Sequence, residues 1–193
     1  MCALIAAAVS VQTLLGAGID RGPRIRAVRP MADAFVSEVN RTQNYGHARE
    51  LKVDSSPTVR TYVLFKVDLS SIDVKQVSLL LYSRTRSRAG YQVRVVGERW
   101  RERRITFANA PPLSPGFVSS GPLRAGSWKA VDVTSLVSGD EKGVSLALTT
   151  VSPKGADFAS RETGLRGPRL IVERQDNGTT QSTTTNGEGL PTP

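Results

Sequence analysis

The sequence predicts an all-β fold, an antiparallel β-sandwich of jelly-roll type with about eight strands. Two observations indicate this class. Apolar and polar residues alternate with a period of two, and turn residues interrupt the alternation about every ten positions. Helical patterning is nearly absent. The one short helical turn expected covers residues 134–139, where the Thr134 hydroxyl would cap the turn and Gly139 would end it.

The clearest strand covers residues 61–69, with the sequence TYVLFKVDL. Alternation directs its side chains to two opposite faces, with Val63, Phe65, Val67 and Leu69 on one and Tyr62, Leu64, Lys66 and Asp68 on the other. In chain order, the same pattern predicts the remaining strands at residues 33–38, 50–54, 77–83, 91–97, 127–133, 143–150 and 168–174.

The ends of the chain differ in composition from its middle, which bounds the folded domain at residues 31–174. Residues 1–19 are an apolar, Ala-rich run that we interpret as a secretory signal peptide. An uncleaved anchor is the competing interpretation, but about 20 strongly apolar residues are needed to span a bilayer. Residues 20–30 form a basic linker, and residues 175–193 a disordered tail or linker rich in Thr, Gly and Pro. We therefore expect a secreted or cell-surface protein with no stable membrane span.

An ordered set of short segments covers nearly all of residues 32–173. The segments are ADAFVSE, NYG, LKVD, TYVLFKVDLSSI, VSLLLYS, RVVGERWRERRITFANAPPL, VDVTSLV, GVSLAL and ADFASRETG followed by PRLIV. In this order and at these separations they resemble the DNRLRE domain, which is also classed as carbohydrate-binding module family 96. The resemblance implies a non-catalytic β-sandwich of secreted and cell-surface proteins, often found beside polysaccharide-degrading domains. Some members bind acidic polysaccharide such as alginate.

The stretch DFASRE carries two acids and an arginine around one aromatic residue. A glycosidase needs two carboxyl groups roughly 5 to 9 Å apart, but Asp157 and Glu162 would point to opposite faces of a straight strand. We favour structural roles instead, with Phe158 in the core and with Arg161 and Glu162 tying the loop to backbone and to an opposite charge. Trp100, flanked by arginines, is likewise expected to be a core or rim aromatic residue.

Candidates for catalytic and metal chemistry are few. The single cysteine lies in the apolar leader, so the domain has no thiolate chemistry. The only histidine, His47, lies in a turn among basic residues and is expected to be solvated, so no catalytic residue is assigned. No cofactor is required. Calcium is an optional ligand, because it binds carboxylate oxygens, and the available acids are Asp33, Asp54, Asp132 and Asp157.

The charge balance indicates a polyanionic partner. The chain has 26 Lys and Arg against 17 Asp and Glu, a formal net charge of +9 at pH 7. The expected carbohydrate-binding surface consists of Arg41, Tyr45, Arg49, Lys52 and Arg60, in which the tyrosine offers a ring face and the others offer charge. A second basic patch consists of Arg84, Arg86 and Arg88, which would form a row on one face of an extended segment. A solvated turn is its competing interpretation.

Two functions remain open at this point. The first is a non-catalytic carbohydrate-binding module that holds an acidic, alginate-like polysaccharide, or another anionic cell-surface polymer, for an attached enzyme domain. The second is a structural or adhesive β-sandwich without a specific sugar ligand. A lyase or hydrolase is a distant third. Specific nucleic-acid binding is disfavoured, because the sequence predicts neither a recognition helix nor a basic sheet interleaved with aromatic residues.

Overall fold

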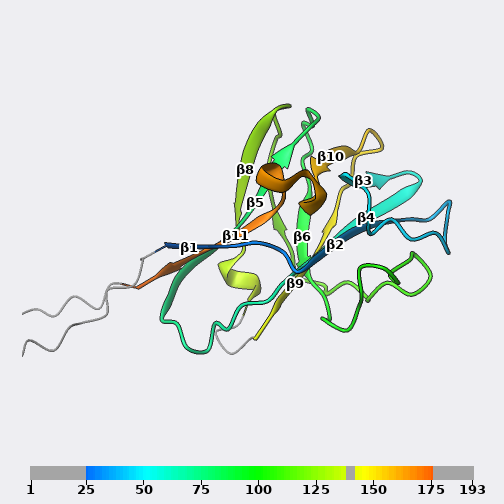
Figure 1. Ribbon diagram of the computed structural model, residues 1–193. Coiled ribbons are helices and arrows are strands. Elements are labelled where there is room, and N and C mark those ends of the chain that lie inside the picture. Colours follow the sequence, from blue (N-terminus) through cyan, green and yellow to red (C-terminus); the bar gives the residue numbers. More distant parts are fainter. Residues whose placement is uncertain (1–24, 138–141, 176–193) are drawn as a thin grey trace, which may run out of the picture.

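The computed structural model describes residues 25–137 and 142–175, and these ranges confirm the all-β fold class (Figure 1). They contain eleven strands and two short 3-10 helices. In chain order these are β1 (Ile25–Val28), β2 (Ala32–Ser37), β3 (Glu50–Ser55), β4 (Thr58–Phe65), β5 (Val74–Ser83), β6 (Gln92–Val95), β7 (Val118–Ser119), β8 (Ser127–Asp132), η1 (Thr134–Leu136), β9 (Val144–Thr149), β10 (Ala156–Ala159), η2 (Arg161–Arg166) and β11 (Arg169–Arg174).

The strands form two layers that are joined through the β3–β4 hairpin. In the first layer, β5 pairs with both β8 and β11, and β1 lies outside β11. Strand β10 pairs with the end of β5 and with β3. The second layer has the order β2-β4-β9-β6-β7. All of these pairings are antiparallel, which is the arrangement of a β-sandwich. The jelly-roll connectivity stays a prediction.

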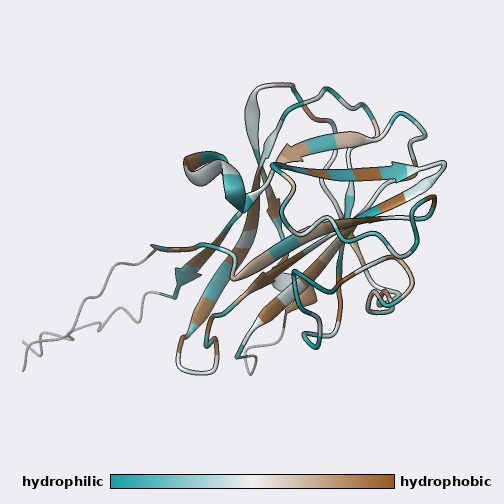
Figure 2. Ribbon diagram, turned by 45° about the vertical axis from the view of Figure 1, so that its right-hand side comes forward, coloured by the Kyte–Doolittle hydropathy of each residue, from teal (hydrophilic) through white to brown (hydrophobic). Residues whose placement is uncertain are grey.

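The main core fills the space between the two layers. Leu79 of β5 and Leu170 of β11 belong to the same buried cluster as Phe65 of β4 and Leu146 of β9. Each fully buried side chain of this kind contributes about 1.5–3 kcal/mol. Apolar bands therefore run along the strands in the middle of the molecule, whereas many of the turns are polar (Figure 2).

A second, smaller core lies on the other side of the second layer, beneath the loop of residues 96–113. Tyr62 and Leu64 of β4 pack there with Trp100. The Trp100 ring meets the Tyr62 ring edge-on at 6.1 Å, and its Nε1 donates a hydrogen bond of 3.0 Å to Ser145 Oγ. The predicted division into two faces is confirmed for residues 62–65, and both faces are buried there because the loop covers β2 and β4 (Figure 1). The strand ends at Phe65, earlier than predicted, and Lys66 and Asp68 beyond it are exposed.

The outer face of the first layer is open in the described part of the chain, except where η2 lies against β5. Leu80 and Tyr82 of β5 point outward in alternation with the fully buried Leu79 and Leu81. Trp128 of β8 lies opposite Tyr82 in the register and is 38% exposed. The loop of residues 96–113 therefore covers the outer face of the second layer, whereas the outer face of the first layer is accessible to a ligand.

All eight predicted strands are present, and the described residues add three short ones, β1, β7 and β10. Strand β1 lies within residues 20–30, the predicted linker, and pairs with β11 from Ile25 opposite Glu173 to Val28 opposite Leu170. Its side chains are mostly exposed, so its sequence lacks the alternation that marks a strand. Strand β10 has only four residues, which is too few for the same pattern to show.

The predicted helical turn exists as η1, but its predicted cap is wrong. Thr134 is the first residue of the turn rather than its cap, and no side chain caps it. The Thr134 hydroxyl donates instead to Asp132 Oδ1 at 2.6 Å and accepts from the Val77 amide at 2.9 Å. Its role is therefore to tie the turn to β5. Gly139, the predicted end of the turn, lies outside the described residues.

Three further predictions concern the ends of the chain. The signal peptide at residues 1–19 lies outside the described residues, and so does the tail from residue 176 onward. Within the described ranges, no helix combines the length and the apolar character needed to cross a membrane.

Candidate functional site

The stretch DFASRE spans the end of β10 and the start of η2. Asp157 and Phe158 belong to β10, whereas Arg161 and Glu162 belong to η2. The straight strand assumed in the sequence analysis therefore ends before Arg161. Phe158 is fully buried and meets Tyr91 edge-on at 5.0 Å, so the strand is fixed in the main core.

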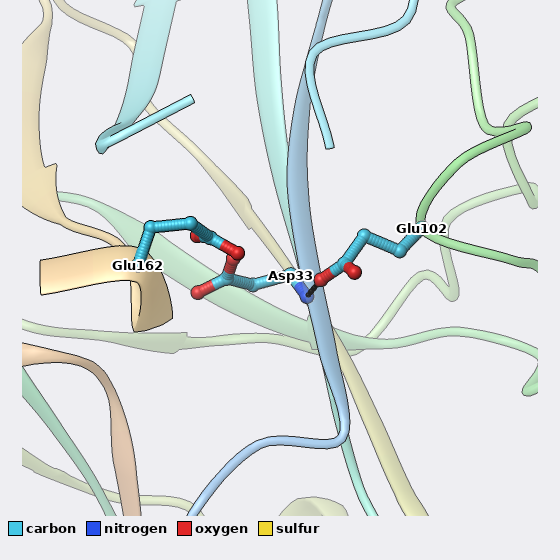
Figure 3. Close-up of side chains that lie close together, drawn as sticks. All are labelled: Asp33, Glu102 and Glu162. Atoms are coloured by element: carbon cyan, nitrogen blue, oxygen red, sulfur yellow. Dashed lines mark hydrogen bonds between the residues drawn. The ribbon is translucent and has the colours of Figure 1, made fainter. Parts of the chain in front are cut away.

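A cluster of three carboxylates surrounds the Arg161 side chain. Asp33 of β2, Glu102 of the covering loop and Glu162 of η2 lie close together (Figure 3), with one oxygen of each within 4.8 Å of the others. Arg161 Nε lies 3.2 Å from an oxygen of Glu102 and 3.2 Å from one of Glu162. Its Nη1 donates to the carbonyl oxygen of Met31. The cluster thus links three elements that are distant in sequence.

Asp33 is the most deeply placed member of this cluster. Its Oδ2 accepts a 2.8 Å hydrogen bond from the Arg161 amide, and its own amide donates to Glu102 Oε1 at 3.0 Å. Burial raises the pKa of Asp33 to about 7, and the charges of Glu162 and Glu102 add to this rise, while the Arg161 amide opposes it. The site therefore holds more negative charge than one guanidinium neutralises.

The structure does not bring the three favoured calcium ligands together. In the described ranges, the one group of acids spaced for a metal contains Asp33 but neither Asp132 nor Asp157. Asp132 accepts hydrogen bonds from Thr134 and from Gln76, and these hold its pKa below the usual range. Burial raises the pKa of Asp157, although the Lys52 charge opposes this. Calcium binding stays a prediction, and of its three expected ligands only Asp33 belongs to the cluster beside Arg161.

The residues of the predicted carbohydrate-binding surface have different neighbours, and the surface stays a prediction. Arg41 and Arg60 both stack on the ring of Phe107, at 5.0 and 5.2 Å. Tyr45 stacks on Phe35, with ring centroids 4.2 Å apart and planes at 15°, so one of its faces is already covered. Lys52 lies 2.7 Å from Glu50 and 5.8 Å from the Phe35 ring. Arg49 lines a hollow beside η2, and Glu50 links Lys52 to Arg84, which lines the same hollow.

The second basic patch stays a prediction. Arg84, Arg86 and Arg88 are all exposed, in alternation with the half-buried Thr85 and the buried Ser87. Arg84 lies 3.7 Å from Glu50 and lines the same hollow as Arg49. Neither of the other two arginines forms a salt bridge with a described residue.

The hollow that joins residues of both predicted surfaces has a volume of about 530 Å³ and is called here the first hollow. Its lining comes from the start of β3, the end of β5, β10 and η2, and consists of Arg49, Tyr82, Arg84, Ala159, Thr163, Leu165 and Arg166. Three guanidinium groups and one tyrosine ring in a hollow of this size favour an anionic ligand with an apolar face.

An aromatic pair extends from this hollow across the open sheet face. Tyr82 and Trp128 meet edge-on, with ring centroids 5.4 Å apart and planes at 77°. The Arg166 guanidinium lies 4.8 Å from the Tyr82 ring, and the Arg169 guanidinium lies 5.1 Å from the Trp128 ring. The face therefore presents aromatic surface and positive charge side by side.

Sequence reasoning missed Tyr82, Trp128, Arg166 and Arg169. The alternation already contained a signal for the two aromatic residues. Tyr82 lies between Leu81 and Ser83, which both point inward on β5. Trp128 is three positions from the buried Val131, so on a strand it points to the opposite, outer face. An aromatic residue at an outward position is a candidate for ligand binding, because burial does not explain it.

The sandwich therefore has an open sheet face with aromatic and cationic side chains, an arrangement typical of a binding module. Comparison with known families agrees with this class. The family model of carbohydrate-binding module family 96 matches residues 25–174, and the chain belongs to that family. Families of this kind are typically non-catalytic. No curated protein matches the sequence.

Proposed function

We propose that this carbohydrate-binding module holds an acidic polysaccharide on the open face of its first layer. The observation that carries the proposal is the pair of the half-buried Tyr82 and the exposed Trp128, with an arginine stacked on each ring and the first hollow beside it. The opposite layer is a poorer candidate, because its outer face is covered by residues 96–113.

The chemistry of a uronate polymer fits these groups. The C–H face of a pyranose ring is apolar and packs against an aromatic ring, while each carboxylate accepts paired hydrogen bonds from a guanidinium group. Arg49, Arg84 and Arg166 would receive the charge in the first hollow. The net charge of +9 would raise the encounter rate with any polyanion, so it supports binding without defining the sugar.

The proposed module does no chemistry itself and needs no cofactor. Two of the three clustered carboxylates, Glu102 and Glu162, share Arg161 between them. A glycosidase requires room between its two carboxyl groups for the sugar, and here a protein side chain fills that room. We propose in addition that the protein is secreted or attached to the cell surface and that it delivers an attached enzyme domain to its polymer.

The experiment is a calorimetric titration of the full chain with alginate, pectate, a sulfated glycan and a neutral glucan, at low and at moderate salt, with and without calcium. Trp128→Ala should weaken binding to the preferred acidic polymer about tenfold, and Arg166→Gln about threefold to tenfold. Arg103→Gln is the matched control, because it removes the same charge from an exposed position on the covering loop. Binding that moderate salt abolishes and that all three variants weaken equally would favour the structural or adhesive role instead.

A further inference from the structure

A second hollow, of about 240 Å³, lies against the other side of η2. It is lined by Arg29, Pro30, Arg161, Gly164, Gly167, Pro168 and Arg169. Three of these residues are arginines. Arg161 already contacts Glu102 and Glu162. The other two, Arg29 and Arg169, form no salt bridge with a described residue. Such a lining favours an anionic group, as in the first hollow.

The aromatic pair contacts one arginine from each hollow. Arg166, which lines the first hollow, stacks on Tyr82. Arg169, which lines the second, stacks on Trp128. Because the two rings also contact each other, they connect arginines that line both hollows. A linear polymer that carries charges on separate rings can contact such a connected set of side chains.

The three arginines of the second hollow differ in how many hydrogen bonds and salt bridges they form within the protein. Arg161 gives its Nε to two carboxylates, so only part of its guanidinium group is available. Arg169 donates from Nη2 to the carbonyl oxygen of Leu165 at 2.7 Å, which fixes its position. Arg29 is exposed and forms no salt bridge with a described residue. Arg29 is therefore the position at which the second hollow can be tested without disturbing the fold.

We infer that the two hollows are two anion subsites of one extended site, and that the ligand is an oligomeric acidic glycan that reaches both. The inference rests on the proposed function. Charged units occupy the hollows, and the rings between them lie on Tyr82 and Trp128. A monomer or dimer fills only the first hollow, which is larger and offers three arginines.

The test is a length series of oligouronates, from dimer to hexamer, titrated into the full chain. Affinity should rise once the oligomer is long enough to reach both hollows. Arg29→Gln should lower the affinity for the hexamer about threefold and leave the dimer unchanged. Arg84→Gln, in the first hollow, should lower the affinity for both. Arg103→Gln, with the same loss of charge, should change neither.

The outcomes separate the two proposals. If no oligouronate and no acidic polymer binds, the proposed function fails and the inference fails with it. If the hexamer binds and Arg84→Gln weakens it while Arg29→Gln does not, the function stands and the second subsite is refuted. An equal loss for dimer and hexamer in Arg29→Gln would also refute it, because that pattern indicates diffuse attraction. Thermal unfolding of each variant excludes loss of fold as the cause.

Discussion

Replacement of Asp33 by Asn tests the electrostatics of the cluster around Arg161. The asparagine keeps an oxygen that can accept the hydrogen bond from the Arg161 amide, and it removes a charge that lies close to Glu102 and Glu162. Because Asp33 has an exposed fraction of only 1%, its charge is not screened by water as a surface charge would be.

The sign and size of the effect follow from the pKa of Asp33, which rises from 3.8 to about 7 on folding. The folded protein holds this proton more tightly than the unfolded chain does, so the contribution of Asp33 to stability falls as the pH rises through that window. Each pH unit corresponds to about 1.36 kcal/mol. The full difference, from 3.8 to about 7, is therefore worth up to about 4 kcal/mol. Asp33→Asn should be more stable than the original chain at pH 8 and close to it at pH 4.

Urea unfolding at several pH values between 4 and 8 measures this difference directly. The comparison of variant with original chain at each pH cancels most contributions of the other acids. If the difference in the free energy of unfolding between Asp33→Asn and the original chain does not change with pH, burial does not raise the pKa of Asp33 and the account is refuted. A variant that loses stability at pH 8 would show that the Asp33 charge is a favourable partner of Arg161.

Three further predictions concern the same framework. Trp100→Ala should lower the free energy of unfolding by about 3–5 kcal/mol, because it empties the second core; a urea midpoint near that of the original chain would contradict this. Gly46→Ala should cost about 1–3 kcal/mol, because its Cβ would lie 2.2 Å from the carbonyl oxygen of Glu102; an unchanged melting temperature would show that the loop moves aside easily. Arg161→Gln should destabilise the chain less when Asp33 is already Asn, since one of the carboxylates is then neutral; additive losses in a double-mutant cycle would contradict the coupling.

The fold could be predicted because the alternation of apolar residues records directly which strand faces are buried. The alternation could not show that β4 is buried on both faces. It assigns Tyr62 and Leu64 to the outer face of the sheet, and these residues are buried only because the loop with Trp100 covers them. Short strands such as β10 leave no pattern of their own. They form because neighbouring strands offer unpaired backbone groups.

The candidate site was harder to predict than the fold, because it is assembled from segments distant in sequence. Residue type singled out Arg49 and Arg84 separately, and only the packing of β3, β10 and β5 places them in one hollow. Arg41 and Arg60 have the same residue type but stack on Phe107. Residue type alone does not show which arginines line the first hollow, because the fold decides where each one lies.

The central claim is that the ligand lies on Trp128, and the tryptophans themselves can report it. The chain has two, of which Trp100 is 7% exposed and Trp128 is 38% exposed. Quenching of fluorescence by acrylamide should therefore come mainly from Trp128. A saturating acidic hexasaccharide should protect this residue and reduce the quenching, and Trp128→Phe should abolish the change. Saturable binding of the same hexasaccharide with unaltered quenching would place the ligand elsewhere and contradict the account.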